Sequence, residues 1–201
     1  MIVVYIHGAS ATAESFNHIR EHVSCQDVCF EYDSKNGFAE NLKIMAEKLK
    51  EYNKVFFVAH SLGGIYALHL AEMFPNKTIG AVTLSTPYGG SRAADYVKYF
   101  LPFSRLLRDI GPNSEPMEKI NKIKIKWPWC NIITTSGASP FLTEPNDGVV
   151  TIESMMHLSD KMETINVSLN HYEVVISNQV IEMINDRLSR VILNQFVLVL
   201  P

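Results

Sequence analysis

The sequence predicts an α/β protein built on a mainly parallel β-sheet with helices on both faces. Short apolar runs rich in β-branched and aromatic residues predict six strands, and several are too uniformly apolar to have a solvent-facing side. These runs lie at residues 2–7, 27–32, 54–59, 79–85, 129–135 and 162–167. Apolar side chains at helical spacing occupy residues 14–23, 38–51 and 62–73. Strands that alternate with helices require right-handed crossovers, which produce a parallel sheet.

The composition fits one folded domain. The chain has 201 residues, and 47% of them are hydrophobic, which allows a substantial core. The 18 basic and 21 acidic side chains give a net charge of −3, and neither sign forms a long run. We therefore expect no nucleic-acid partner and treat residues 1–201 as a single domain.

Cysteine usage and the start of the chain indicate the cellular compartment. The three cysteines are an odd number, and Cys25 and Cys29 lack a second Cys/His pair at zinc-site spacing, so we expect reduced thiols and no metal. The opening segment MIVVYIHG has neither a basic leader nor a cleavage site. No apolar run reaches the roughly 18 residues that suggest a membrane span. These features predict a soluble, cytoplasmic protein without stable membrane insertion.

The segment VFFVAHSLGGIYALHL, residues 55–70, places Ser61 between a predicted strand and a predicted helix. Such a turn strains its central residue, and small residues two positions before and after it let strand and helix pass closely. Ala59 and Gly63 occupy those positions, a one-methyl departure from G-x-S-x-G. The turn would expose the hydroxyl at the carboxyl end of the sheet, as a nucleophile requires. A serine that only caps the helix is the alternative.

The loop after the first strand has the residues expected of an oxyanion hole. Attack by a serine on an acyl carbon creates an oxyanion, which needs two preorganised donors. We assign the N–H of Leu62, directly after the serine, and the N–H of Ala9 in the segment YIHGAS, residues 5–10. Gly8 would let the backbone approach the substrate closely. Taken alone, this loop would indicate an ordinary turn.

A candidate acid follows the fifth predicted strand in TEPNDGVVTIESM, residues 143–155. A carboxylate at this point can hold a catalytic imidazole in the right tautomer and stabilise its charged form. We assign Asp147 to this role, with Glu144 as its local competitor and a simple Asx-turn as the structural alternative.

A candidate base lies in SLNHYEVV, residues 168–175, between the sixth strand and the last helix. An imidazole can take the serine proton and return it to the leaving group near neutral pH. His171 is the histidine in a loop that follows a strand after the candidate acid. Ser61, Asp147 and His171 are therefore the predicted catalytic residues.

The order of these three residues on an alternating sheet resembles that of the α/β-hydrolase superfamily. The motifs YIHGAS, AHSLGG, NDGVVTIESM and NHYEVV are similar to those of small bacterial lipases and esterases, some of which have A-H-S-x-G-G at the serine. TLSTPYGGS, residues 83–91, is similar to a segment of class 2 lipases and PGAP-type esterases. The resemblance implies a minimal α/β-hydrolase fold and a serine carboxylic-ester hydrolase that needs no cofactor or metal. Its substrate would be a small-molecule or lipid ester.

Residues 86–126 form a connection much longer than usual between two strands. An aromatic and aliphatic series within it allows two interpretations, a pair of packed surface helices or a short lid that forms an acyl-binding wall. The candidate substrate-binding residues are Gly8, His60, Tyr88, Tyr96, Phe100 and Phe103.

The apolar tail RVILNQFVLVLP, residues 190–201, follows the expected last helix. It is too short to span a bilayer. We expect either an added strand or a contact through which the protein associates with itself.

Two other functions stay open at the level of sequence. The same triad would serve a thioesterase or an acyltransferase, because it does not distinguish an alcohol from a thiol leaving group. A noncatalytic binding protein could also keep this fold. Peptidase, epoxide hydrolase and haloalkane dehalogenase activities rank lower, the last two because they normally need an aspartate where Ser61 stands.

Overall fold

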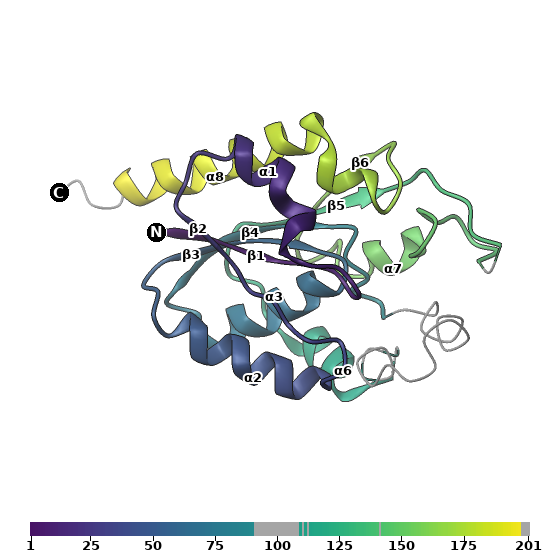
Figure 1. Cartoon of the computed structure of the whole chain (residues 1–201), viewed down its shortest axis with the longest axis horizontal. Coiled ribbons are helices and arrows are strands. Elements are labelled where there is room, and N and C mark those ends of the chain that lie inside the picture. The colour runs from purple at the N-terminus through teal and green to yellow at the C-terminus, as the bar shows by residue number, and fades with distance from the viewer. Residues whose placement is uncertain (91–108, 110, 112, 141, 198–201) are drawn as a thin grey trace.

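Six parallel strands form one sheet in the described part of the chain, in the order β2-β1-β3-β4-β5-β6 (Figure 1). This computed structural model describes residues 1–90, 109, 111, 113–140 and 142–197, with side chains up to 194. The strands are β1 (Ile2–Ile6), β2 (Asp27–Cys29), β3 (Val55–His60), β4 (Thr78–Leu84), β5 (Trp129–Thr134) and β6 (Glu163–Val167). All neighbouring pairs are parallel, so the predicted six-stranded sheet is confirmed.

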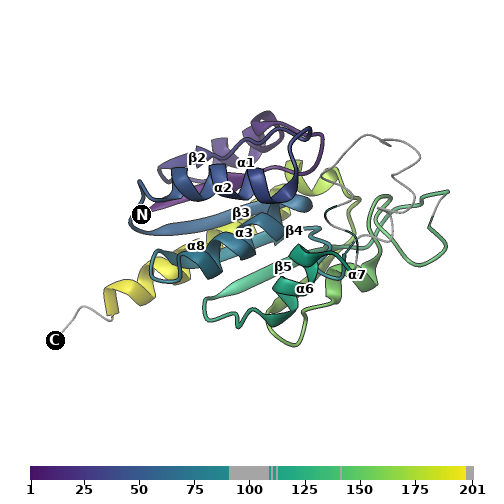
Figure 2. The same cartoon turned by 90° about the horizontal axis from the view of Figure 1, so that it is seen from below.

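Helices cover both faces of the sheet, as predicted (Figure 2). One face carries α2 (Phe38–Leu49), α3 (Leu62–Met73) and α6 (Glu115–Lys122), and the other carries α1 (Asn17–His22) and α8 (Asn178–Val197). The shorter elements are η1 (Ala13–Phe16), α7 (Ile152–Met156) and η2 (Glu173–Ile176). The helix predicted at residues 14–23 is thus a 3-10 turn followed by a short α-helix.

The two faces bury separate hydrophobic cores because successive residues of a strand point to opposite sides. In β3, Phe57 packs with the α2 and α3 side chains, whereas Phe56 and Val58 pack with those of α1 and α8. Every residue of β3 and β4 is buried, which accounts for their uniformly apolar sequences. With both faces covered, polar groups can gather only at the ends of the strands, where open α/β sheets bind ligands at the carboxyl edge.

The prediction of an added strand at residues 190–201 is wrong. Helix α8 continues to Val197. Ile184, Leu188 and Val191 recur at helical spacing and are buried against the sheet face that carries α1, so they hold this stretch in the helix. Residues 198–201 lie outside the described residues, and self-association through the tail stays a prediction. Within the described chain, no helix is long and apolar enough to cross a membrane.

The long connection between β4 and β5 is described only in part. Residues 91–108, 110 and 112 lie outside the described residues, and both interpretations of this segment stay predictions. The described remainder packs into the core, since Tyr88, Met117 and Ile120 are all buried.

Candidate active site

Ser61 lies in a sharp turn between β3 and α3. Its φ of 52° and ψ of −123° are a conformation that costs a non-glycine residue about 1–3 kcal/mol. Its amide N–H donates to the Leu84 carbonyl at 2.8 Å, but its side chain makes no capping bond to α3. The helix-capping alternative is therefore unsupported. The hydroxyl has no hydrogen-bond partner among the described residues.

Two glycines let α3 come close enough to the sheet to hold this turn. A Cβ at Gly63 would collide with the main-chain carbonyls of Ile6 and His7, and one at Gly64 would collide with the Thr86 side chain. Glycine after the serine is therefore a requirement of the backbone. Before the serine, the methyl group of Ala59 fits fully buried within the sheet.

The loop after β1 lies directly against this turn. A Cβ built on Gly8 would be 3.2 Å from Ser61 Cβ and 3.0 Å from His60 Nδ1. The N–H groups of Ala9 and Leu62 have no hydrogen-bond partner among the described residues. Two main-chain donors near this turn are thus uncommitted, and their role as an oxyanion hole stays a prediction.

A hollow of about 610 Å³ opens beside the same loop. Polar side chains line it from the loops after β1 and β2, among them Ser10, Thr12, Glu31 and Lys35. Ala11 and Tyr32 line it as well, so the hollow presents both polar and apolar surface.

Asp147 and His171 form a buried pair at the carboxyl ends of β5 and β6. His171 Nδ1 donates to Asp147 Oδ2 at 2.7 Å, and the His171 main-chain N–H donates to the Asp147 carbonyl at 3.0 Å. Asp147 is 1% exposed and His171 is 3% exposed. Of the two carboxylates considered in the sequence, Asp147 is the one bonded to this imidazole.

Hydrogen bonds keep the Asp147 carboxylate charged despite its burial. Its Oδ1 accepts the N–H groups of Val149 at 3.0 Å and Val150 at 2.8 Å. Burial has the largest effect and raises the pKa of Asp147, but the hydrogen bond and charge of His171 and the bonds from Thr134 and Val150 together lower it below its ordinary value. A charged acceptor thus fixes the His171 tautomer with Nε2 left to act as a base.

Two hydroxyl groups that were not predicted from the sequence lie behind Asp147. Thr134 Oγ1 donates to Asp147 Oδ2 at 2.6 Å, and Ser85 Oγ lies 2.8 Å from Thr134 Oγ1. Because Thr134 gives its proton to the carboxylate, Ser85 is the donor of the second bond. Ser85 has a positive φ of 51°. Its one sequence signal is its place as the last residue of the predicted strand 79–85.

His60 connects the turn that carries Ser61 to the candidate base, His171. Its Nε2 lies 2.9 Å from the His171 carbonyl oxygen, and the two rings are tilted with centroids 4.7 Å apart. The residue that precedes Ser61 thus contacts His171, although no described hydrogen bond links the Ser61 hydroxyl to the imidazole. Such bonds are often long before substrate binds.

The candidate substrate-binding residues fall into three groups. Gly8 lies against Ser61, and His60 is a buried neighbour of His171. Tyr88 lies in the core instead of facing a substrate, because its ring is fully buried and its hydroxyl donates to Thr83 and accepts from the Trp129 indole. The three that lie outside the described residues are Tyr96, Phe100 and Phe103.

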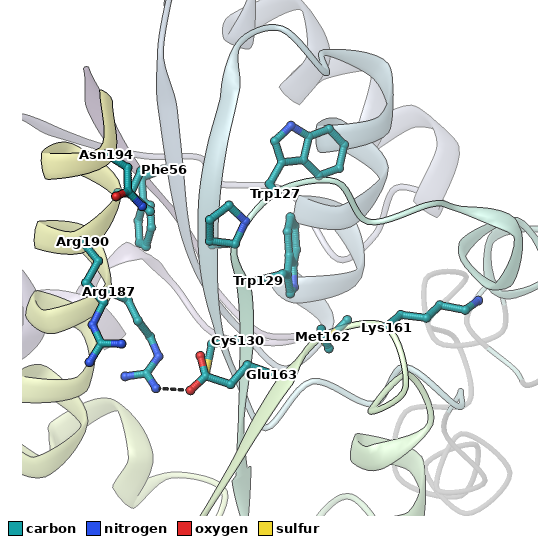
Figure 3. Close-up of a pocket in the computed structure, with 13 residues that line it drawn as sticks. Phe56, Trp127, Trp129, Cys130, Lys161, Met162, Glu163, Arg187, Arg190 and Asn194 are labelled. Carbon is teal, nitrogen blue, oxygen red and sulfur yellow. Dashed lines mark hydrogen bonds and ion pairs between the residues drawn. The ribbon is translucent and has the colours of Figure 1, made fainter. Parts of the chain in front are cut away.

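A separate cavity of about 390 Å³ lies at the amino ends of β4, β5 and β6 (Figure 3). Trp127 and Trp129 line it, and Arg187 and Arg190 approach it from α8. Arg187 pairs with Glu163 at 2.6 Å, and Arg190 is paired within α8. This cavity opens at the edge of the sheet opposite to Ser61 and His171, so it is not a site for their chemistry.

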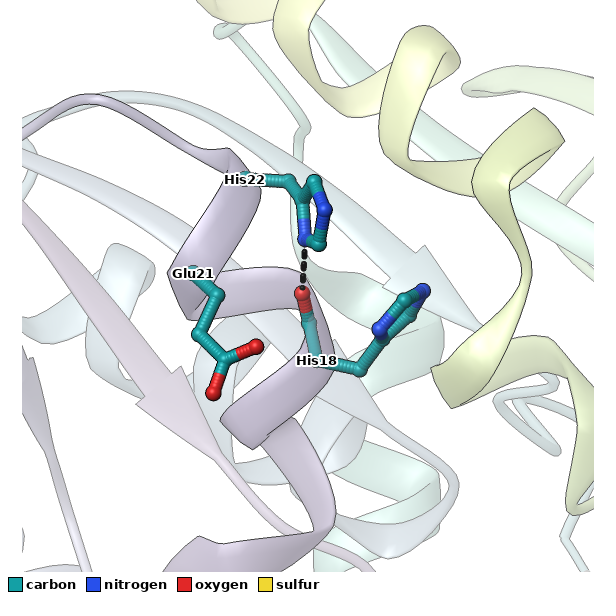
Figure 4. Close-up of side chains that lie close together, drawn as sticks. All are labelled: His18, Glu21 and His22. Atoms are coloured by element: carbon teal, nitrogen blue, oxygen red, sulfur yellow. Dashed lines mark hydrogen bonds between the residues drawn. The ribbon is translucent and has the colours of Figure 1, made fainter.

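The described residues contain one group that could hold a metal, on α1 (Figure 4). Ligand atoms of His18, Glu21 and His22 lie within 4.8 Å of one another. His18 Nε2 already contacts Asn178 Oδ1 at 3.0 Å, and His22 Nδ1 donates to the His18 carbonyl at 2.8 Å. This group shares no described hydrogen bond with the Asp147–His171 pair.

Comparisons with known proteins give a likeness of fold. No family model and no curated protein sequence matches the chain. The mature form of a Bacillus licheniformis lipase aligns with a TM-score of 0.75 at 17% identity, covering 90% of this chain and 89% of the lipase. A metagenomic carboxyl esterase aligns with a TM-score of 0.73 at 16% identity, covering 96% of this chain and 76% of the esterase.

A third similar structure is the RedJ thioesterase of the prodiginine pathway in Streptomyces coelicolor. Its TM-score is 0.62 at 12% identity, covering 95% of this chain and 90% of that protein. Together with the parallel sheet, these likenesses show that the chain has a minimal α/β-hydrolase fold.

Proposed function

We propose that the protein is a serine hydrolase that cleaves carboxylic esters through an acyl-enzyme on Ser61. The observation that carries the proposal is the strained, uncapped Ser61 at the same edge of the sheet as the buried Asp147–His171 pair. The lipase and the carboxyl esterase that share the fold support the same class of substrate.

In the proposed first step, His171 Nε2 takes the Ser61 proton while the serine oxygen attacks the ester carbonyl. Asp147 holds the imidazole through Nδ1 and stabilises its charged form. The imidazolium then gives the proton to the leaving alcohol, and the acyl group stays on Ser61. Water, activated by the same imidazole, attacks the acyl-enzyme and releases the acid.

The two uncommitted main-chain donors would stabilise the charge that develops in both steps. The N–H of Leu62 directly follows the serine, that of Ala9 follows Gly8, which packs against Ser61, and each would donate to the oxyanion. Loss of one such donor typically lowers kcat by about 10²- to 10³-fold. This role needs neither a metal nor an organic cofactor.

Covalent labelling with a fluorophosphonate tests the proposal directly. We expect the wild-type protein to be labelled on Ser61 and to hydrolyse p-nitrophenyl esters, and Ser61→Ala to lose both properties while its melting temperature is retained. An initial-rate series over acyl-chain length, below and above substrate aggregation, would then separate esterase from lipase behaviour. Folded wild-type protein that is neither labelled nor active would favour a noncatalytic binding protein.

A thioesterase is the second candidate function. Its support is the shared fold with the RedJ thioesterase. Oxygen esters and thioesters with the same acyl group would separate the candidates. A carboxylesterase should show the higher kcat/KM on the oxygen ester after correction for the intrinsic reactivity of each substrate, and the reverse order would identify a thioesterase.

A further inference from the structure

We infer that His60 is a positioning residue that fixes the base, His171, against the nucleophile, Ser61. This inference rests on the proposed function. It gives His60 a role in the reaction geometry and not in direct contact with the substrate.

The main chain and ring of His171 are held by three hydrogen bonds. Two of them go to Asp147, from the His171 N–H at 3.0 Å and from Nδ1 at 2.7 Å. Both fix His171 only relative to the loop that carries the acid. The third runs from His60 Nε2 to the His171 carbonyl oxygen at 2.9 Å. Because His60 directly precedes Ser61, this third bond ties the base to the nucleophile.

The partner atom settles the tautomer of His60. A carbonyl oxygen can only accept a hydrogen bond, so Nε2 must carry the hydrogen. Burial, and secondarily the nearby His171 charge, lowers the pKa of His60 to about 3, although its hydrogen bond to His171 opposes this shift. His60 therefore remains neutral at working pH. A neutral donor holds His171 without opposing the positive charge that the base acquires during the reaction.

The other ring nitrogen of His60 indicates that stability alone does not explain a histidine here. Nδ1 is buried and has no hydrogen-bond partner in the part of the chain that the structure describes. Leaving such a group unpaired typically costs about 1–3 kcal/mol. A leucine would fill the same interior space without that cost. What the leucine cannot supply is the donor to His171.

The position of the ring also places it against the oxyanion loop. A Cβ on Gly8 would lie 3.0 Å from Nδ1, and the His171 ring lies on another side with its centroid 4.7 Å away. His60 is thus packed between the loop that carries Ala9 and the loop that carries His171. A side chain in this place can hold both loops at the distance that the reaction needs.

Replacement of the His60 donor by an apolar side chain tests the inference. We expect His60→Leu to lower kcat by about 10- to 100-fold with KM nearly unchanged, because a displacement of about 1 Å in a reacting group can cost that much. His60→Gln places an amide donor near the position of Nε2 and should recover most of the lost kcat. A purely structural role would predict no recovery that depends on the donor.

His69 provides a matched control. It is also buried, and its Nε2 lies 3.1 Å from a main-chain carbonyl oxygen, that of Pro116, away from the candidate site. His69→Leu should lower the melting temperature as His60→Leu does, but should leave kcat per labelled serine unchanged. If His60→Leu fails to fold, His60→Gln is compared with His60→Asn, whose shorter side chain cannot reach the His171 carbonyl and should be the slower variant.

The outcomes separate this inference from the proposed function. An inactive, unlabelled wild type would overturn both. If the wild type is active, two results would overturn only the role of His60. One is an equal kcat for His60→Leu and His60→Gln, and the other is a loss of kcat in His69→Leu as large as that in His60→Leu. A drop in kcat that appears at position 60 alone and is restored by glutamine supports the inference.

Discussion

At the scale of single residues, the candidate site depends on how buried polar groups are satisfied. Asp147 is almost fully buried, yet its two carboxylate oxygens accept four hydrogen bonds. The bonds from His171, Thr134 and Val150, together with the charge of His171, favour the charged form and outweigh the effect of burial on its pKa. The acid can therefore stay ionised in an interior that would otherwise favour its protonation.

Removal of one of these hydrogen-bond donors to Asp147 should lower the stability of the folded protein in a pH-dependent way. In the folded state the pKa of Asp147 is lowered, so its charge contributes stability above the ordinary carboxylate pKa, and this contribution is lost as the pH falls toward the lowered value. We expect Thr134→Val to reduce the free energy of unfolding near pH 7 by about 1–3 kcal/mol. The loss of stability between neutral and acidic pH should become smaller than in the wild type.

Urea unfolding at pH 7 and near pH 3 measures both effects. Thr135→Val is the matched control, because the Thr135 hydroxyl bonds the Val167 carbonyl at 3.0 Å and does not touch the acid. The same pH dependence for the two variants would contradict the role given to Thr134.

These hydroxyl groups also show where prediction from sequence stops. Ser61, Asp147 and His171 could be proposed because each follows a strand and has an unusual neighbourhood in the sequence. Thr134 and Ser85 are ordinary polar residues at strand ends, and they meet only because β4 and β5 are neighbours in the sheet. The bond from His60 to His171 spans 111 positions and is equally invisible in the sequence.

At the scale of elements, the turn between β3 and α3 depends on the contact of α3 with the end of β1. We expect Gly63→Ala to destabilise the protein by about 3 kcal/mol or more, since the added methyl group meets two main-chain carbonyls that cannot move aside. Folded molecules should also lose activity, because the displaced β1 end carries the candidate oxyanion loop.

Thermal unfolding and the rate of fluorophosphonate labelling measure the two effects. Ala59→Gly is the comparison variant, because it changes the other flank of the turn toward the usual G-x-S-x-G pattern. It should cost about 1 kcal/mol through backbone entropy and leave the labelling rate unchanged. A Gly63→Ala protein as stable and as fast as the wild type would refute the close packing of α3 on β1.

The elements themselves were predicted with unequal success for physical reasons. Strands β3 and β4 are buried on both faces, so their apolar runs are unambiguous. Beyond residue 190 the sequence is apolar at nearly every position, and such a run fits a strand as well as a helix. Packing decides between them, because Leu188 and Val191 continue the buried stripe of α8.

At the scale of the whole molecule, the two edges of the sheet are expected to have separate roles. The carboxyl edge holds the candidate chemistry, with its strained turn and its uncommitted donors. The amino edge holds the cavity lined by Trp127 and Trp129, where the Arg187 charge is paired with Glu163. The parallel topology could be predicted from the sequence, and it places all strand starts at one edge and all strand ends at the other. The cavity could not, because it depends on where α8 crosses the sheet.

A substitution at the amino edge tests this separation. Trp129 is 4% exposed, and its indole N–H donates to the Tyr88 hydroxyl at 2.9 Å. Trp129→Phe removes that bond and part of the buried surface, so we expect the free energy of unfolding to fall by about 1–3 kcal/mol. The rate per folded molecule, measured as kcat after titration of the labelled serine, should stay at the wild-type value because Ser61 and His171 keep their own hydrogen bonds. A fall in kcat per titrated serine would instead mean that the core around Tyr88 transmits strain from one edge of the sheet to the other.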